Sequence, residues 1–455
     1  MPVTTIHPEY SAHLPLWRMI DQALDGEGSV KADSANLPKT SGMIEAERQN
    51  AENSYLYQAY VTRAQYEGWV GDSLRTMMGL VARLTPEVEL PPALAGLEDS
   101  VTNDGYGLRQ LFLRVCRQTI AYGRSPLLAN VDDSGRPYID LYRPQSAINW
   151  KTASVGGRDD LVLAVLVESR PGPGADEYAH DAQTVYRVFR LADGFCASVV
   201  LDENGDTVEP ERILGRVDSR GNVLSGVGFI PLVFSGSTDN TPGVDEIPML
   251  TMARAALKNY QLSADYFGAL HQTSHPQPWV SGIDESHSLT VTGPSAAWDL
   301  GPTGQCGYLE FAGAGIEALR QAMADQKNAA LEAGAKVMDV TGTESGEARR
   351  ARQNDQHATL HSIVMTAAEG VEQALKYCAE WVGADSKAVR FSVKPDFTSG
   401  QVDALILAQL QTAVVAGGVS WQSYWQYLTT GKLPDRSYED EREAVGNDGP
   451  ALGDL

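Results

Sequence analysis

The chain has 455 residues, about three times the typical length of a single domain, so two or three structural units are expected. Hydrophobic residues make up 43% of the chain and charged residues 21%, and this composition excludes wholesale disorder. The formal net charge is −23. Proteins that grip nucleic acid by its phosphates usually carry a basic face, so any contact of this chain with DNA must be loose.

Cysteine spacing and the terminal sequence exclude further classes of protein. The cysteines are scattered and form no C-x-x-C pair: Cys116, Cys196, Cys306 and Cys378. This spacing argues against a zinc site and a disulfide framework, and indicates free thiols in a reducing cytoplasm. Residues 1–10 lack the features of a secretory signal, and the apolar run at 404–416 is interrupted and too short to span a bilayer. We expect a protein made in the cytosol, without membrane contact.

The first part of the chain, residues 1–125, has the pattern of helices. One candidate helix covers Tyr55–Leu84 and ends before Pro86, because proline disfavours continuation of a helix. A second candidate covers about Tyr106–Tyr122, with apolar residues near helical spacing and Gly123 at its end.

Residues 126–235 change to short β-branched and aromatic runs separated by turn signals, such as Asp133-Ser134-Gly135 and Glu203-Asn204-Gly205. The clearest runs, which predict strands of one antiparallel meander, are Leu161–Glu168, Thr184–Arg190 and Phe195–Leu201. The segment Pro171–Gly174 predicts a surface loop. This part should therefore form an antiparallel sheet.

Beyond a polar linker at 235–243, the second half begins with a helical pattern. Asp245 is expected to cap a helix that runs to about His271, with Pro248 in its first turn. Pro276–Ala312 has the texture of short strands and turns, and a second helix is expected over about Gly315–Met338.

A very long third helix is the clearest element of the sequence. Apolar residues repeat every three or four positions from Leu360 to Val382, and Thr341-Gly342-Thr343-Glu344 has the form of a capping box. We expect a helix from about Glu344 to Trp381, on the order of 55 Å long at 1.5 Å per residue.

The C-terminal part is expected to hold a strand, two shorter helices and a frayed acidic tail. Their ranges are Ala388–Val393 for the strand, Ser399–Val415 and Ser420–Thr430 for the helices, and Asp435–Leu455 for the tail.

No catalytic pattern is present in the sequence. It lacks GxxxxGK[ST], GxSxG and HExxH. Two histidine pairs have i,i+4 spacing, His271/His275 and His357/His361, but neither has a recognisable third ligand. The carboxylate pairs Asp132-Asp133 and Asp202-Glu203 lie beside hairpin turns, where acidic residues are common for backbone reasons. We therefore predict no enzyme, no metal and no cofactor.

Several local motifs occur in order over nearly all of the chain. They are Trp17–Leu24 followed by Gly26-Glu27 and Lys31, Asn36-Leu37-Pro38, Tyr57-x-x-Tyr60-x-x-Arg63-Ala64, Tyr142-Arg143-Pro144, Ile148-Asn149-Trp150 and Ile230-Pro231-Leu232-Val233. With these motifs and this order of elements, the chain resembles the portal subunits of tailed double-stranded-DNA bacteriophages. It departs from that family at Ile20, where an arginine is usual, with Arg18 two places earlier, and in its short C-terminal part.

The resemblance implies an α+β portal fold with named parts. These are a wing (1–243), a first stem helix (244–275), a clip (276–312), a second stem helix (313–338), a tunnel loop (339–344), a long wing helix with a strand (345–398), and a crown with an acidic tail (399–455).

The resemblance also implies a function and partners. The chain would form a homo-oligomeric ring, a dodecamer in the family, at one vertex of the capsid. Double-stranded DNA would pass through the ring without sequence specificity during packaging and ejection. The partners would be the terminase large subunit, head–tail connector proteins, and the major capsid and scaffolding proteins. Two alternatives stay open: a phage-encoded hydrolase that uses carboxylates of the β-rich half, and another virion structural protein such as a capsid subunit.

Two candidate sites follow for the channel. Thr341, Gly342, Thr343 and Glu344 are expected to form a tunnel loop at its narrowest part, because Gly342 permits a tight turn and the capping box restarts a helix; an ordinary helix connection is the alternative. The dense basic cluster Arg349, Arg350 and Arg352 is expected to lie near the tunnel and touch passing phosphates. Salt bridges to Glu347, Asp355 or a neighbouring subunit are the alternative.

The third candidate site is the clip, which contains no lysine or arginine. Its acidic residues are Asp284, Glu285, Asp299 and Glu310, and its aromatic residues include Trp279, Trp298 and Tyr308. Such a surface would repel DNA, dock a basic partner, or do both. The alternative is that the aromatics fill the clip's own core and the seams between subunits.

Overall fold

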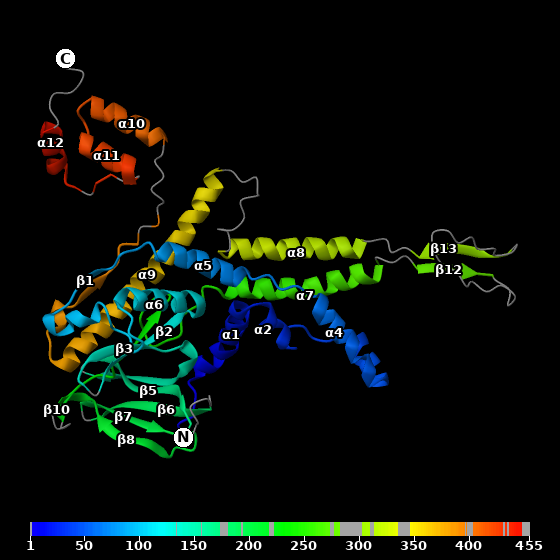
Figure 1. Ribbon diagram of the computed structural model, residues 1–455, viewed down its shortest axis with the longest axis horizontal. Helices are drawn as coiled ribbons and strands as arrows, with labels where there is room; N and C mark the ends of the chain where they lie inside the picture. The colour runs from blue at the N-terminus through cyan, green and yellow to red at the C-terminus, as the bar shows by residue number, and fades with distance from the viewer. Residues whose placement is uncertain are drawn as a thin grey trace. The chain divides into compact units, whose positions relative to one another are not determined.

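The computed structural model divides the chain into two compact units, Met1–Lys394 and Pro395–Leu455. It describes residues 2–132, 134–155, 157–172, 181–192, 194–217, 223–273, 277–282, 303–309, 314–334, 346–395, 397, 404–430, 433–434 and 436–447. Figure 1 shows helices and antiparallel strands in the first unit and helices in the second, which confirms the predicted α+β class. Within the described residues, no helix is both long and apolar enough to cross a membrane.

The N-terminal part of the first unit is helical, as predicted. Its helices are α1 (Pro8–Asp25), α2 (Glu27–Ala32), α3 (Ser41–Gln49), α4 (Ser54–Arg63), α5 (Trp69–Val81) and α6 (Leu108–Tyr122). Gly123 ends α6 with a φ of 75°, and a side chain there would approach the carbonyl oxygen of Glu246 to 2.4 Å. A glycine is therefore required at this position, both for its backbone conformation and for space.

The single helix expected over Tyr55–Leu84 is wrong, because the chain breaks between α4 and α5. Ala64 is extended, and the backbone of Gln65 is held by Ser263: the Gln65 N–H donates to Ser263 Oγ (2.9 Å), which in turn donates to the Gln65 carbonyl (3.0 Å). This pairing with a residue about two hundred positions away replaces the helical hydrogen bonds that a continuous helix would need.

The predicted antiparallel meander is confirmed as a five-stranded sheet in the order β4-β5-β6-β7-β8. Its strands are β4 (Ala147–Val155), β5 (Arg158–Pro171), β6 (Ala182–Ala192), β7 (Phe195–Leu201) and β8 (Thr207–Ile213). A three-stranded sheet has the order β11-β2-β3, with β2 (Arg124–Val131), β3 (Pro137–Leu141) and β11 (Leu232–Gly236). Three strand pairs complete the unit: β1 (Glu87–Glu89) with β14 (Arg390–Ser392), β9 (Gly215–Val217) with β10 (Val223–Gly226), and β12 (Gln277–Ser281) with β13 (Gln305–Leu309).

The long helix α9 (Gly346–Val382) covers the three-stranded sheet and α6, as its apolar periodicity predicts. Its buried stripe ends in Trp381, which closes a core between the two sheets and donates to the Gly215 carbonyl (3.1 Å). Contact with β11 is close: a side chain at Gly370 would come within 2.9 Å of the Ser235 Cβ, and Thr366 Oγ1 donates to the Gly236 carbonyl (2.8 Å).

A buried arginine joins the two sheets. The Arg124 guanidinium, on β2, lies 4.1 Å from the ring centroid of Trp150 and 3.8 Å from that of Phe234, and donates to the Pro242 carbonyl (2.7 Å). Its side chain is fully buried, and its Nε and Nη1 groups have no hydrogen-bond partner within the described part of the chain. Burial lowers the pKa of Arg124, while the charges of Glu9 and Asp245 oppose that shift.

The second unit contains α10 (Ala404–Val415), α11 (Trp421–Thr430) and α12 (Tyr438–Asn447). The expectation of a frayed tail is wrong for residues 438–447. Glu441 on α12 accepts hydrogen bonds from the Ser420 N–H (2.8 Å) and from Ser423 Oγ (2.7 Å), so an acidic side chain joins α12 to the start of α11. These caps explain why this acidic sequence is ordered.

Candidate functional site

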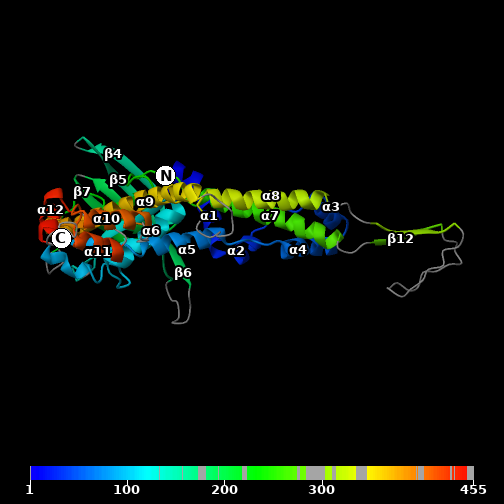
Figure 2. The ribbon, with the colours of Figure 1, turned by 90° about the horizontal axis from the view of Figure 1, so that it is seen from above.

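The most distinctive feature of the first unit is a helical hairpin with a small β hairpin at its tip. The helices α7 (Leu250–Thr273) and α8 (Ala314–Glu332) lie side by side in Figures 1 and 2, and the strands β12 and β13 follow beyond their ends. The chain leaves along α7 and returns along α8, so the two helices are antiparallel.

The first half of α7 is anchored in the helical N-terminal part. Met252, Ala256 and Tyr260 are buried, Tyr260 packs edge-on against Tyr66, and Tyr60 donates to Asp265 Oδ1 (2.5 Å). From Asp265 onward, none of the described side chains of α7 is buried. The second half of the helix therefore projects from the body.

The start of α7 differs from the prediction. Asp245 does not cap the helix, which begins at Leu250; its Oδ2 accepts from the backbone N–H groups of Thr238 (2.7 Å) and Asp239 (3.2 Å) instead. The carboxylate thus stabilises the linker before the helix, a role that capping rules applied to the sequence alone do not distinguish from a cap.

The returning helix α8 is exposed over most of its surface. Among its described side chains only Ala330 is buried, and the half-buried apolar positions Ile316, Leu319 and Met323 fall on the same stripe. This spacing is that of one helix packed along one neighbour, α7. Beyond its end, Ser73 Oγ donates to the Gly334 carbonyl (3.2 Å) and fastens this turn to α5.

The β hairpin at the tip carries an exposed tryptophan. Trp279 on β12 pairs with Gly307 on β13, and a side chain at Gly307 would meet the indole at 3.0 Å, so the indole lies over the glycine backbone. Trp279 nevertheless remains 42% exposed. An indole that covers a cross-strand glycine stiffens the pair and still leaves a ring face for a partner.

The other predicted site residues fall largely outside the described part of the structure. This holds for Thr341, Gly342, Thr343 and Glu344, and for Asp284, Glu285, Trp298 and Asp299. The backbone of Tyr308 lies in β13, opposite Pro278. The backbones of Arg349, Arg350 and Arg352 lie in α9. The side chains of all these residues lie outside the described set, so the roles expected for them stay predictions.

The carboxylates considered for catalysis have structural roles where they are described. Asp132 Oδ1 accepts from the N–H groups of Ser134 (2.9 Å) and Arg136 (2.9 Å), and Asp202 Oδ1 accepts from those of Asn204 (2.9 Å) and Asp206 (2.8 Å). Both carboxylates stabilise hairpin turns. Hydrogen bonds lower the pKa of each group, above all the one from the Ser134 hydroxyl (2.6 Å) for Asp132 and the one from the Asp206 N–H for Asp202.

The described residues bring no metal site together. Among them, no three His, Cys, Asp or Glu side chains form a group that could hold an ion. In the predicted histidine pairs, the side chains of His275 and His357 fall outside the described set. Cys116, Cys196 and Cys378 are buried free thiols, and Cys306 is an exposed one.

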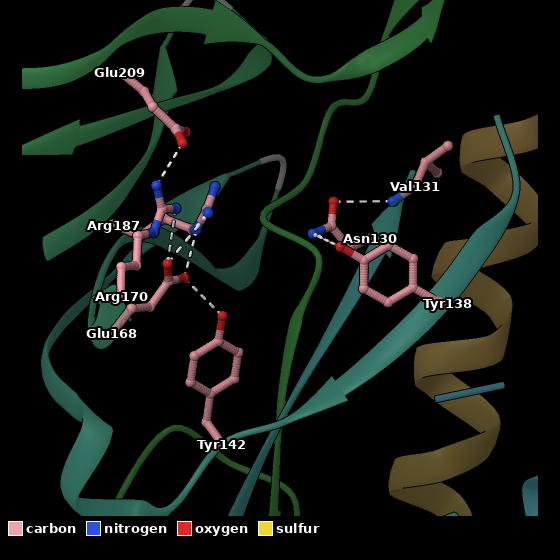
Figure 3. A network of polar contacts seen from close by, with 8 residues as sticks. All are labelled: Asn130, Val131, Tyr138, Tyr142, Glu168, Arg170, Arg187 and Glu209. Atoms are coloured by element: carbon pink, nitrogen blue, oxygen red, sulfur yellow. Dashed lines mark hydrogen bonds and ion pairs between the residues drawn. The ribbon is translucent and has the colours of Figure 1, made fainter. Parts of the chain in front are cut away.

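A network of partly buried charges, which the sequence did not reveal, joins the two sheets through Tyr142 (Figure 3). Glu168 on β5 accepts from Arg187 Nε (2.6 Å), from Arg170 Nη2 (3.0 Å) and from the Tyr142 hydroxyl (2.8 Å). Arg170 continues to Glu209 on β8. Burial alone would raise the pKa of Glu168, but the hydrogen bond and charge of Arg187, together with the hydrogen bonds of Tyr142 and Arg170, hold this pKa below its ordinary value.

Asp140, on β3, lies close to this network, and among the described residues no cation forms an ion pair with its carboxylate. It lines a pocket with Asp104 and Arg114. Burial, followed by the charge of Glu168, raises the pKa of Asp140 to about 6, although Arg187 opposes the shift. Among the described residues, Glu168 and Glu209 are thus paired with arginines, whereas the neighbouring Asp140 is not.

We expect Asp140→Asn to stabilise the protein at neutral pH. The folded pKa lies above the unfolded value, so ionisation of Asp140 disfavours the folded state, and stability falls as pH rises from about 4 to about 6. The variant should gain about 1–2 kcal/mol at pH 8, and its advantage should fade towards pH 4. Urea midpoints at both pH values, at one protein concentration and with Glu203→Gln as an exposed control, measure the effect. An advantage that does not change with pH would contradict it.

Comparisons with known proteins place these features in context. Residues 248–382, from just before α7 to the end of α9, match a family described as a domain of unknown function, DUF4055. No curated protein matches the chain.

Several solved structures are similar to the chain. A chain in the neck of an empty gene transfer agent particle, computed with C6 symmetry, has 16% identity and a TM-score of 0.40, over 80% of this chain and 90% of its own length. A chain in the virion of a native gene transfer agent particle has 18% identity and the same TM-score and coverage. A phage portal protein of the HK97 family from Corynebacterium diphtheriae has 12% identity and a TM-score of 0.30, over 72% of this chain and 92% of its own. Over most of its length, the chain is thus similar to a phage portal protein and to chains of gene transfer agent particles.

Proposed function

We propose that the chain is a portal subunit: it assembles into a ring at one capsid vertex through which double-stranded DNA is packaged and ejected. The observation that carries the proposal is the helical hairpin α7–α8 with its β tip, followed by a 37-residue helix that returns to the body. A stem, a clip and a long wing helix occur in this order in the family that the sequence motifs resemble.

The charge of the chain suits a conduit. Each phosphate held tightly by a basic side chain would slow a moving DNA, whereas a subunit with a net charge of −23 offers few such contacts. In this proposal the chain does no catalysis, and the energy for packaging comes from the terminase. The assembly is a homo-oligomer, a dodecamer in the family, in contact with capsid and scaffolding proteins.

The hairpin and its tip are the proposed docking site for the terminase large subunit and later for head–tail connector proteins. Trp279 offers an exposed aromatic anchor on a paired strand, and aromatic anchors are enriched in interface cores. The acidic residues Asp284, Glu285 and Asp299 would steer a basic partner to it, together with Trp298 and Tyr308 as further aromatic contacts. Residues 341–344 and the three arginines at 349, 350 and 352 are the proposed channel elements.

Electron microscopy of the purified protein tests the proposal most directly. We expect rings with a central channel and, by mass photometry, a particle of about twelve times the chain mass of 49.1 kDa. Closed shells would favour the capsid alternative instead. A monomer at micromolar concentration, combined with turnover of an ester, peptide or glycoside substrate, would favour the hydrolase alternative and overturn the proposal.

A further inference from the structure

The second unit contains a long segment without charge. Residues 404–431, which include α10 and α11, hold no Asp, Glu, Lys, Arg or His, although the chain as a whole has 59 acidic and 36 basic residues. A solvent-exposed helical pair normally carries charges on its outer faces. The absence of charge along both helices indicates that their outer surface is covered by protein.

The exposed side of α11 is aromatic. Ser423 and Tyr427, four positions apart, are buried on one side of the helix, whereas Trp421 and Trp425, also four apart, are 49% and 67% exposed on another. On α10, Val414 is buried, but Ile406 and Val415 are exposed. Both helices thus present large apolar side chains outward, beyond those that fill the contact between them.

The interior of this unit is small. The large side chains buried in its described helices are Leu410, Val414 and Tyr427. A unit of this size buries too little apolar surface to be stable by its core alone and usually needs a covalent link, a metal or association with another chain. Glu441 accepts hydrogen bonds from Ser420 and Ser423, and these bonds fasten the start of α11 to α12.

We propose that Trp421 and Trp425 form an interface between adjacent copies of the chain, with the α10–α11 pair of one copy packed against that of the next. The inference rests on the proposed ring, which brings identical units next to each other at high effective concentration. It also assigns a contact that the ring proposal alone does not specify.

The lack of charge on the α10–α11 surface favours a second copy of the chain as the partner that covers it. An uncharged apolar surface binds best to another uncharged surface, because a charged group buried against it would lose its hydration without compensation. The chain is acidic overall, and the α10–α11 surface of another copy offers the matching uncharged area. The neighbouring helix α12 carries Glu439, Asp440 and Glu443, which would repel DNA and anionic membranes from the same region.

Photocrosslinking in the full-length protein tests the contact. With p-benzoylphenylalanine in place of Trp425, irradiation should give a product of twice the chain mass of 49.1 kDa on a denaturing gel, and mass spectrometry should join position 425 to residues 404–430. The same probe at Tyr438, an exposed aromatic residue on α12, is the matched control and should give little of this product. Crosslinks that stay within one chain, or that reach only residues 1–394, overturn the inference.

A variant with Trp421→Gln and Trp425→Gln measures the contribution to assembly. The concentration at which half of the rings dissociate should rise by roughly tenfold or more, because truncating exposed aromatic anchors at an interface removes much of its affinity. Tyr438→Gln should leave it unchanged, and circular dichroism should show unchanged helix content for both. Wild-type rings without the double-mass product would overturn this inference alone. Absence of rings and of that product would overturn the proposed function as well.

Discussion

Glu168→Ala should destabilise the first unit by about 3 kcal/mol, at the lower end for a buried pair, because it leaves a largely desolvated cation without its partner. Glu168 and Arg187 have side-chain exposures of only 13% and 12%, and their contact at 2.6 Å is part of the network that joins the sheets. Removing the carboxylate also leaves the Tyr142 hydroxyl without its acceptor. The charge of Arg187 would then remain in a site with little water.

The double variant Glu168→Leu with Arg187→Met should recover much of this loss, since both buried charges leave together and apolar groups of similar volume replace them. Glu209→Gln is the control: Glu209 pairs with Arg170 at the exposed end of the network and should contribute less than about 1 kcal/mol. Urea unfolding of the four proteins at pH 7 checks the order. A double variant as unstable as Glu168→Ala would show that side-chain packing at this site, and not the pairing of the two charges, determines the loss of stability.

The pH dependence of this pair has the opposite sign to that of Asp140. The folded pKa of Glu168 lies below its unfolded value, so the pair contributes stability above about pH 4.3, and this contribution is lost as pH falls through the folded pKa. The difference between wild type and Glu168→Ala should therefore be full at pH 7 and shrink in acid.

Arg124→Ala should also be strongly destabilising, by about 3–4 kcal/mol, because it empties the slot between Trp150 and Phe234. Arg124→Met should lose less, about 1–2 kcal/mol, since it fills the slot and removes the Nε and Nη1 nitrogens, which have no hydrogen-bond partner among the described residues. Arg124→Lys keeps the charge but cannot stack as a plane, so it should fall between these two.

The arginine should also affect the N-terminal segment. The His7 ring stacks on Trp150 with ring centroids 4.0 Å apart, and the backbone N–H of His7 donates to the Ile148 carbonyl (2.8 Å). Hydrogen exchange at His7 should accelerate in Arg124→Ala and change little in Arg124→Met. Equal exchange in all variants would mean that the segment is held independently of Arg124.

The sequence predicted those elements whose pattern is local and repeated. The meander of β5, β6 and β7 follows from alternating runs and turn residues, and α9 from a continuous apolar stripe. The break between α4 and α5 could not be predicted, because it depends on Ser263 reaching the backbone of Gln65 from another helix. Helix propensity depends on the local sequence alone, so the propensities of residues 55–84 cannot reveal that contact.

Buried charges escaped prediction for a related reason. Glu168 and Arg187 lie in strands that also hold exposed charged residues, so a single sequence does not separate a paired, partly buried charge from one in solvent. Arg124 is the only charged residue of β2, but it stands at the first position of the strand, where the sequence does not distinguish a buried arginine from one at an exposed strand end. The aromatic side of α11 could have been found, since Trp421 and Trp425 have helical spacing in a segment without charge. The candidate site is different: the residues of 341–344 indicate a turn and a helix start, and those of the clip an acidic, aromatic surface, but their place along a channel follows only from the family resemblance.

The pairing of β1 with β14 constrains how the protein can be made. These strands join Glu87–Glu89 to Arg390–Ser392, and α9, which covers the three-stranded sheet, precedes β14 directly. At a synthesis rate of about 5–20 residues per second, roughly 15–60 s separate the two strands on the ribosome. During that time the nascent chain exposes the apolar sheet surface that α9 later covers. Folding of the first unit therefore cannot finish until almost all of its sequence has been translated, and a chain stalled before α9 would expose an aggregation-prone sheet surface.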